Sequence, residues 1–317
     1  MQVKNLAIGP PTGEKLLPCN NAFASLFNRS DFLFDHGLAH HPLFELSALR
    51  GLAARIPKYN NFVYWQNGSV AQAESWAANP ASRLSLDETL AGIASNDSLV
   101  VLKHADQDPI YGPVLQEILQ RIYAASSPAL QADIVLGESL IFINSPKRKT
   151  VYHLDLESNF LLQVTGEKLV YVFDHADRSL TPHSELEDHC CGNINGAIYK
   201  SDRQNDAHFY HLTPGHGVHF PSTAPHWVHN GDQVSVSINI NFDLVSVHDR
   251  LRRIYRMNRT IRRLGFDPKG PGTSPVRDAM KTSVSRSVSF ALDLARRIKK
   301  NQDAGASYPM WRPNRTA

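Results

Sequence analysis

The stretch "TVYHLDLESNF" (150–160) places His153 and Asp155 two residues apart between apolar neighbours. On a β-strand, residues i and i+2 point to the same side, so both side chains face one space if the strand extends that far. His226, which follows Pro225 and opens another strand-like run, is the candidate third ligand. Two histidines and one carboxylate on one side of a metal form the facial triad of non-haem iron(II) oxygenases. This triad leaves three octahedral positions open, which suits a chelating cosubstrate and dioxygen.

Several other patterns compete with this interpretation. The chain has 15 histidines, so a His-x-Asp pattern can arise by chance, with both side chains on the surface or in a hydrogen bond of the core. "HFYH" (His208 and His211) and "HGVH" (His216 and His219) resemble metal motifs, but neither brings a suitably placed carboxylate. His229 lies near them in the sequence. Cys190 and Cys191 are adjacent, and two adjacent thiolates rarely reach one tetrahedral zinc, so "EDHCCGN" is interpreted as a loop.

The elements that must position these residues are strands. From about Ala132 to Asp243 the chain consists of short β-branched or aromatic runs separated by turn residues, such as "IVLGESLIFIN", "NFLLQVTG", "KLVYVFD" and "QVSVSININF". This texture predicts a sandwich or barrel of antiparallel strands.

Helical patterns flank the strands. Residues 41–56 and the run "GPVLQEILQRIYAAS" space apolar residues at helical intervals, and Ser85 with Glu88 forms a capping-box signature. After Asp243, residues 245–266 and 282–302 again read as helices. We therefore expect three parts: an N-terminal helical region packing on the core (1–131), the β core (132–243) and a basic C-terminal helical region (244–317).

Composition excludes some classes of protein. The 317 residues include 42% hydrophobic and 20% charged residues, as in ordinary globular proteins, and no apolar run is long enough for a membrane helix. Three cysteines form a poor disulfide framework and the N-terminus lacks a secretory signal, so we expect a cytoplasmic protein.

From Asp249 onward the sequence holds 17 Lys or Arg against 5 Asp or Glu. This basic region predicts either a charged partner or an intramolecular fit onto the acidic remainder.

The chain resembles the JmjC branch of the cupin-fold, 2-oxoglutarate-dependent oxygenases, and in particular the asparaginyl hydroxylase of hypoxia-inducible factor and its bacterial relatives. The resemblance covers residues 134–243. Its first stretch matches at Thr150, His153, Asp155, Asn159, Phe160, Gly166 and Lys168. Its second matches at Pro214, Gly215, Pro221, His226, Val228, Asn230, Ser237 and Asn239. His216 and Pro225 depart from the pattern, and neither is a ligand position in the family.

The resemblance implies a double-stranded β-helix, that is, a jelly-roll core. It also implies Fe(II) held by His153, Asp155 and His226, with O2 and the cosubstrate 2-oxoglutarate at the open positions. Lys168 and Thr150 would hold the far carboxylate of 2-oxoglutarate. Asn159 and Asn239 would orient ligands or cosubstrate.

The implied activity is hydroxylation of an unactivated C–H bond in a protein side chain or small metabolite, with release of succinate and CO2. The alternatives are a non-catalytic cupin-fold sensor and a cupin dioxygenase that does not use 2-oxoglutarate. The resemblance also favours a homodimer through the C-terminal helices. A nucleic-acid partner is not favoured, and no substrate can be named from the sequence.

Overall fold

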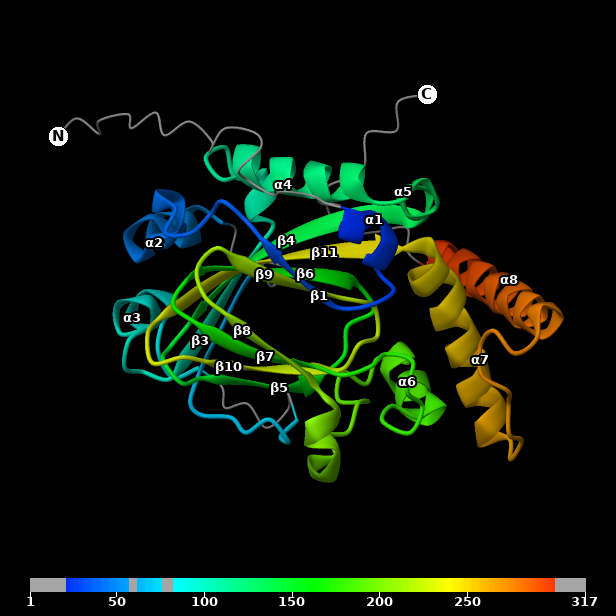
Figure 1. Cartoon of the computed structure of the whole chain (residues 1–317). Coiled ribbons are helices and arrows are strands. Elements are labelled where there is room, and N and C mark those ends of the chain that lie inside the picture. Colours follow the sequence, from blue (N-terminus) through cyan, green and yellow to red (C-terminus); the bar gives the residue numbers. More distant parts are fainter. Residues whose placement is uncertain (1–20, 57–61, 76–81, 300–317) are drawn as a thin grey trace.

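A computed structural model describes residues 21–56, 62–75 and 82–299. Two antiparallel sheets face each other across an interior (Figure 1). Within the described residues, one sheet has seven strands in the order β1-β9-β6-β11-β4-β3-β2 and the other has four in the order β5-β10-β7-β8. The strands are β1 Phe32–Asp35, β2 Val63–Asn67, β3 Ser98–Lys103, β4 Ile134–Asn144, β5 Lys149–His153, β6 Ser158–Thr165, β7 Lys168–Val172, β8 His208–Leu212, β9 His216–Phe220, β10 His226–Asn230 and β11 Ser235–Leu244.

The helices cover the outside of the larger sheet and one end of the sandwich (Figure 1). They are α1 Asn21–Leu26, α2 Leu46–Arg55, α3 Leu86–Ala91, α4 Gly112–Ala125, α5 Pro128–Asp133, α6 His183–Cys190, α7 Arg252–Arg263 and α8 Pro275–Lys299. Shorter helical turns are η2 Pro42–Phe44, η4 Ala105–Gln107, η5 Ser201–Asp206 and the π-helical η6 Ser246–Leu251. None of the described helices is long and apolar enough to cross a membrane.

Alternation along the central strands divides the core into two layers. On β11, Val236, Ile238 and Ile240 pack outward against the helices, together with Phe160 and Leu162 of β6. The intervening residues of β11 are polar and face the smaller sheet. Between the sheets lies an apolar cluster from β6 to β10 and the loop before β10; it comprises Leu161, Val170, Val172, Leu212, Val218, Phe220, Ala224 and Val228. The fold therefore provides a rigid sandwich with a partly polar interior face.

The predicted β core is confirmed, since every run named above lies on a strand between Ile134 and Leu244. The predicted helices at 41–56, 85–96 and 112–126 are also present as α2, α3 and α4. The N-terminal region is not purely helical, however. It contributes β1, β2 and β3, which extend the larger sheet on both sides, so the sheet crosses the predicted boundary at residue 131. The three-part division of the chain stays a prediction.

The C-terminal helices explain much of the basic charge. Arg262 of α7 donates two hydrogen bonds to Glu187 of α6, at 2.9 and 3.2 Å, and Arg259 pairs with Asp188. The interpretation of "EDHCCGN" as a loop is wrong for its first four residues, because Glu187 to Cys190 belong to α6. These long-range ion pairs support the intramolecular fit of the basic region.

Candidate metal and cosubstrate site

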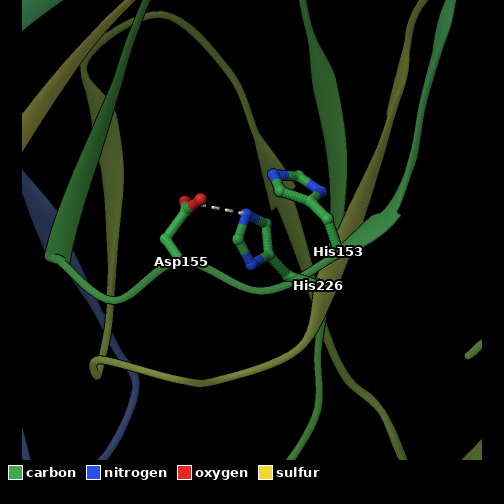
Figure 2. Close-up of side chains that lie close together, drawn as sticks. All are labelled: His153, Asp155 and His226. Atoms are coloured by element: carbon green, nitrogen blue, oxygen red, sulfur yellow. Dashed lines mark ion pairs between the residues drawn. The ribbon is translucent and has the colours of Figure 1, made fainter. Parts of the chain in front are cut away.

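The two histidines are neighbours across a strand pair. β5 and β10 run antiparallel, and His153 at the end of β5 lies directly opposite His226 at the start of β10. Their ring centroids are 4.2 Å apart. Figure 2 shows the carboxylate of Asp155 facing the His226 ring, with the His153 ring beside it. Asp155 Oδ2 lies 3.8 Å from His226 Nε2. One potential ligand atom from each of the three residues lies within 4.8 Å of the others, which is the single such group of three found in the described residues.

Asp155 is held by a turn rather than by the strand. β5 ends at His153, so strand alternation does not carry Asp155 to the site as the sequence suggested. Instead, the backbone N–H of Thr223 donates to the Asp155 carbonyl at 2.7 Å, and Ser222 Oγ donates to the Leu156 carbonyl at 2.5 Å. Thr223 adopts a φ of 64°, a left-handed conformation that is unfavourable for a β-branched residue. Such strain is frequent at functional sites.

Backbone contacts orient both imidazoles. His153 Nδ1 lies 2.8 Å from the Val151 carbonyl and His226 Nδ1 lies 3.0 Å from the Ala224 carbonyl. A carbonyl only accepts, so each Nδ1 carries a proton, and Nε2 is the ring nitrogen that can serve as a metal ligand. Burial, and next the neighbouring His153, lowers the pKa of His226 to about 4. The ring is therefore neutral at physiological pH, which is the form that ligates metals.

A β-bulge brings Thr150 to the interior face. On β10, His226 and Val228 share a face, and they pair with His153 and Thr150 on β5, with a shift in register between the pairs. Between these pairs, two residues of β5, Val151 and Tyr152, lie opposite one residue of β10, Trp227. Without this extra residue, Thr150 would point away from His153 by strand alternation. The bulge cannot be recognised in the sequence, and it turns Thr150 to the same face as His153.

Lys168 is a buried lysine with no acidic partner among the described residues. It is 4% exposed, at the start of β7 and opposite Asn230 on β10. Its Nζ donates to Ser237 Oγ of β11 at 2.6 Å and lies 5.7 Å from the Phe142 ring centroid. Burial lowers the pKa of Lys168 to about 7. An ammonium in this position gains strongly from an anionic ligand, because no carboxylate of the described chain neutralises it.

The two predicted asparagines form a defined chain of hydrogen bonds. Asn159 Nδ2 donates to the Glu157 carbonyl at 3.1 Å, and Asn239 Nδ2 donates to Asn159 Oδ1 at 3.3 Å. Because the carbonyl can only accept, the first bond fixes the orientation of the Asn159 amide, and this in turn fixes that of Asn239. Asn239 Oδ1 is left buried and without a hydrogen-bond donor.

A group of carboxylates that sequence reasoning missed lies at one end of the same face. Glu138 of β4 pairs with Asn241 of β11, and Asp243 follows two residues along β11. Asn241 and Phe242 also pair with Asn159 and Ser158 of β6, which brings Glu157 beside Asp243. Burial, and then the neighbouring Asp155, raises the pKa of Glu157 to about 7. We call Glu138, Glu157 and Asp243 the acidic rim. No spacing of residues in the sequence predicts the acidic rim, because strand pairing brings it together from three segments.

Comparison with solved structures agrees with this architecture. An X-ray structure of YcfD from Escherichia coli matches with a TM-score of 0.51 and 13% sequence identity, covering 86% of this chain and 68% of that one. A second YcfD structure, described as a ribosomal oxygenase, matches with a TM-score of 0.47 and 14% identity, covering 82% and 61%. A third, in complex with cobalt and 2-oxoglutarate, has a TM-score of 0.46 and 13% identity and covers the same shares. No protein-family model and no curated protein matches the sequence.

The class defined by the fold is a mainly β jelly-roll of the cupin type, with flanking helices. The resemblance noted in the sequence is thereby confirmed at the level of the fold. One protein that shares this fold is E. coli YcfD, and the chain spans roughly two thirds of the length of YcfD. At this level of identity, the comparison establishes the fold, and the activity has to be argued from the site.

Proposed function

We propose that this protein is an Fe(II)- and 2-oxoglutarate-dependent oxygenase that hydroxylates a C–H bond and releases succinate and CO2. The observation that carries the proposal is the convergence of His153, Asp155 and His226 on one interior face, with Lys168 buried on the same face. Two imidazoles and one carboxylate suit Fe(II) and leave coordination positions open. YcfD, a protein that shares the fold, is described as a ribosomal oxygenase and has been solved with cobalt and 2-oxoglutarate.

The residues present fit such a metal. The donor set is two imidazole Nε2 atoms and one carboxylate, and the Nδ1 atoms are already used by backbone carbonyls. When bound, the metal supplies the coordination and redox chemistry for O2 and the 2-oxo acid. The chain's own part is to orient the two imidazoles through backbone carbonyls, to fix Asp155 through the strained turn at Thr223, and to exclude water with the apolar cluster between the sheets.

The cosubstrate's far carboxylate is assigned to Lys168 and Thr150. Lys168 and Val172 lie on the same face of β7, and Val172 pairs with His226, so the ammonium lies about four residues along the sheet from the metal ligands. A carboxylate here forms a charge-assisted hydrogen bond in a dry environment, which is stronger than the same bond in water. Thr150 offers a hydroxyl on the same face, and Asn159 and Asn239 lie on the opposite sheet.

The test is succinate release from 2-oxoglutarate by protein reconstituted anaerobically with Fe(II) and then exposed to air, without added substrate. We expect slow succinate formation by the wild type and none by Asp155→Ala, with both proteins folded. Succinate formed equally by both proteins would show that the assigned ligands are wrong. Binding of neither Fe(II) nor 2-oxoglutarate would favour a non-catalytic sensor, and metal-dependent O2 consumption without succinate would favour a cupin dioxygenase that does not use 2-oxoglutarate.

We also propose a cytoplasmic homodimer. Large apolar side chains are exposed along the C-terminal helices: Val276, Met280 and Val284, four residues apart on α8, are 71%, 64% and 51% exposed. This spacing forms one stripe on a helix that packs on α7. A second copy would bury the stripe. Light scattering should report twice the monomer mass for the wild type and a monomer for a Met280→Glu, Val284→Glu double variant; a monomeric wild type would contradict the proposal.

A further inference from the structure

Helices α6 and α7 lie side by side at one end of the sandwich (Figure 1). Their side chains share one apolar cluster with the residues on either side of Asp155; it includes Leu154, Leu156, Leu186, Cys190, Leu251 and Tyr255. Both helices therefore pack against the turn that carries Asp155. Because β5 and β7 both pair antiparallel with β10, this turn after β5 lies near the end of β7, whereas Lys168 lies at the start of β7. The two helices thus border the metal ligands on the side away from Lys168, where the cosubstrate carboxylate is assigned.

Polar contacts fix the register of the two helices. These contacts run antiparallel: Arg262 with Glu187, Arg259 with Asp188, and Arg256 Nε with the Cys190 carbonyl at 2.8 Å. Arg252 lies one turn before Arg256 on α7, so it lies at the C-terminal end of α6, which also carries His189. Burial lowers the pKa of His189, and Asp155 is the charged group that acts on it most strongly. Arg252 and His189 therefore meet at the junction of the two helices with the metal site.

Two buried polar atoms at this junction have no partner. Among the described residues, neither Arg252 Nε nor His189 Nδ1 forms a hydrogen bond, and the Arg252 guanidinium forms no ion pair. In contrast, the arginines that follow it on the α6 side of α7 are all paired; they are Arg256, Arg259 and Arg262. A buried donor without an acceptor costs free energy unless a ligand supplies the acceptor. The junction therefore lacks an acceptor that the described chain does not provide.

We propose that Arg252 and His189 bind an oxygen acceptor of the substrate, a carboxylate or an amide carbonyl, on the outer side of the metal ligands. Arginine carries five N–H donors and no acceptor, so its partner has to bring the acceptor, whereas an imidazole nitrogen can donate or accept. An oxygen bound here lies across the metal ligands from the cosubstrate, so it fixes which part of the substrate faces the metal. This inference rests on the proposed function for its use of a substrate, but not for the binding of an acceptor.

The test is nitrogen-15 NMR of the arginine side chains in the full-length protein with Zn(II) and 2-oxoglutarate added. The Arg252 Nε–H signal is the one that is absent from Arg252→Met. The probes are propionate and propionamide, which carry oxygen acceptors, and propionamidinium, which has the same shape but only donors. We expect an oxygen probe to move the Arg252 signal to higher proton frequency, because a new hydrogen bond deshields the proton, and propionamidinium to leave it unmoved. A signal that moves with neither oxygen probe would overturn the proposal.

The two oxygen probes separate the sources of the acceptor. Movement with propionate alone assigns a carboxylate, movement with propionamide assigns an amide carbonyl, and either result supports the acceptor site. Arg263, exposed at the end of the same helix, is the control for non-specific binding, and its signal should not move. His189→Leu keeps Arg252 and should weaken the binding of the oxygen probes about fivefold, whereas an unchanged affinity would overturn the pairing of the two residues. If Arg252→Met does not fold, Arg252→Lys identifies the signal instead.

Replacement of Zn(II) by Mn(II) reports on the proposed function separately, because a paramagnetic ion accelerates the nuclear relaxation of protons bound near it. If the protons of 2-oxoglutarate do not relax faster while the Arg252 signal still moves with an oxygen probe, the cosubstrate assignment fails and the acceptor site stands. If they relax faster while the Arg252 signal stays in place, the cosubstrate assignment stands and the acceptor site is overturned.

Discussion

Replacing Lys168 by methionine should strengthen the fold and weaken cosubstrate binding at once. Methionine keeps most of the length of the lysine side chain and removes its charge. Lys168 is fully buried, and burial lowers its pKa from 10.5 to about 7. The unfolded chain therefore takes up a proton at higher pH than the folded chain, so this lysine opposes folding increasingly as the pH falls from 10.5 to 7, and by a constant amount below that.

The magnitude follows from the shift. At pH 7 a shift of this size corresponds to about 4 kcal/mol, at 1.36 kcal/mol per pKa unit. Loss of the hydrogen bond to Ser237 offsets about 1 kcal/mol of this gain, so the ligand-free variant should be more stable than the wild type by about 3 kcal/mol. In contrast, a cosubstrate carboxylate left without its cation should bind 100-fold or more weakly, which corresponds to about 3 kcal/mol.

Urea unfolding at pH 7 without ligand measures the first effect, and calorimetric titration of Mn(II)-loaded protein with 2-oxoglutarate measures the second. Lys147→Met is the matched control, because Lys147 is 74% exposed and pairs loosely with Asp232 at 3.5 Å. This control should change stability by less than about 0.5 kcal/mol. A Lys168→Met protein that is less stable than the wild type, or that binds 2-oxoglutarate within threefold of it, would refute the reasoning.

Three further predictions concern single groups. Burial lowers the pKa of His36 to about 4 and of His219 to about 3, so the unfolded chain takes up protons below pH 6.5 that the folded chain does not. In urea unfolding, each histidine should therefore lower the free energy of unfolding by about 2 kcal/mol at pH 5. Equal stability at pH 7 and pH 5 would contradict this. Arg262→Gln leaves the 1% exposed Glu187 carboxylate without its cation and should cost about 3 kcal/mol in the same assay, against about 0.5 kcal/mol for Arg121→Gln, where both partners are about 30% exposed. Equal losses would show that the burial of Glu187 does not matter. Thr150→Val should weaken 2-oxoglutarate binding about fivefold in calorimetry, and an unchanged affinity would place the cosubstrate carboxylate elsewhere.

Much of the β core could be predicted because its strands carry local signals. β6 and β11 combine β-branched residues with turn boundaries, although their places in the sheet do not follow their order along the chain. The strands β1, β2 and β3 were missed. They lie among helical patterns, and β3 is buried along nearly its whole length, so it shows no alternation to distinguish it from a buried helix. Helix α6 was missed because the residues of its first and last turns are polar. Its Glu187 is buried through pairing with Arg262, which lies 75 residues away in the sequence.

The site was predictable only where one segment carries its residues. His153 and Asp155 are neighbours in sequence, although a turn and not the strand brings Asp155 into place. The inward position of Thr150 depends on a bulge, and the acidic rim depends on the register of β4 with β11. Both are properties of strand pairing, which no local pattern of residues encodes. The roles of Lys168, Asn159 and Asn239 came from family resemblance, and their burial and contacts fit those roles.

The most direct test of the central claim is the metal dependence of 2-oxoglutarate binding. Calorimetric titration of the wild type with 2-oxoglutarate should give one site per chain when Mn(II) is present and greatly weakened binding when the metal is removed by a chelator. Asp155→Ala should behave like the metal-free wild type, although it retains Lys168. Binding of 2-oxoglutarate that is equally tight with metal, without metal and in Asp155→Ala would contradict the assignment of one shared metal and cosubstrate site.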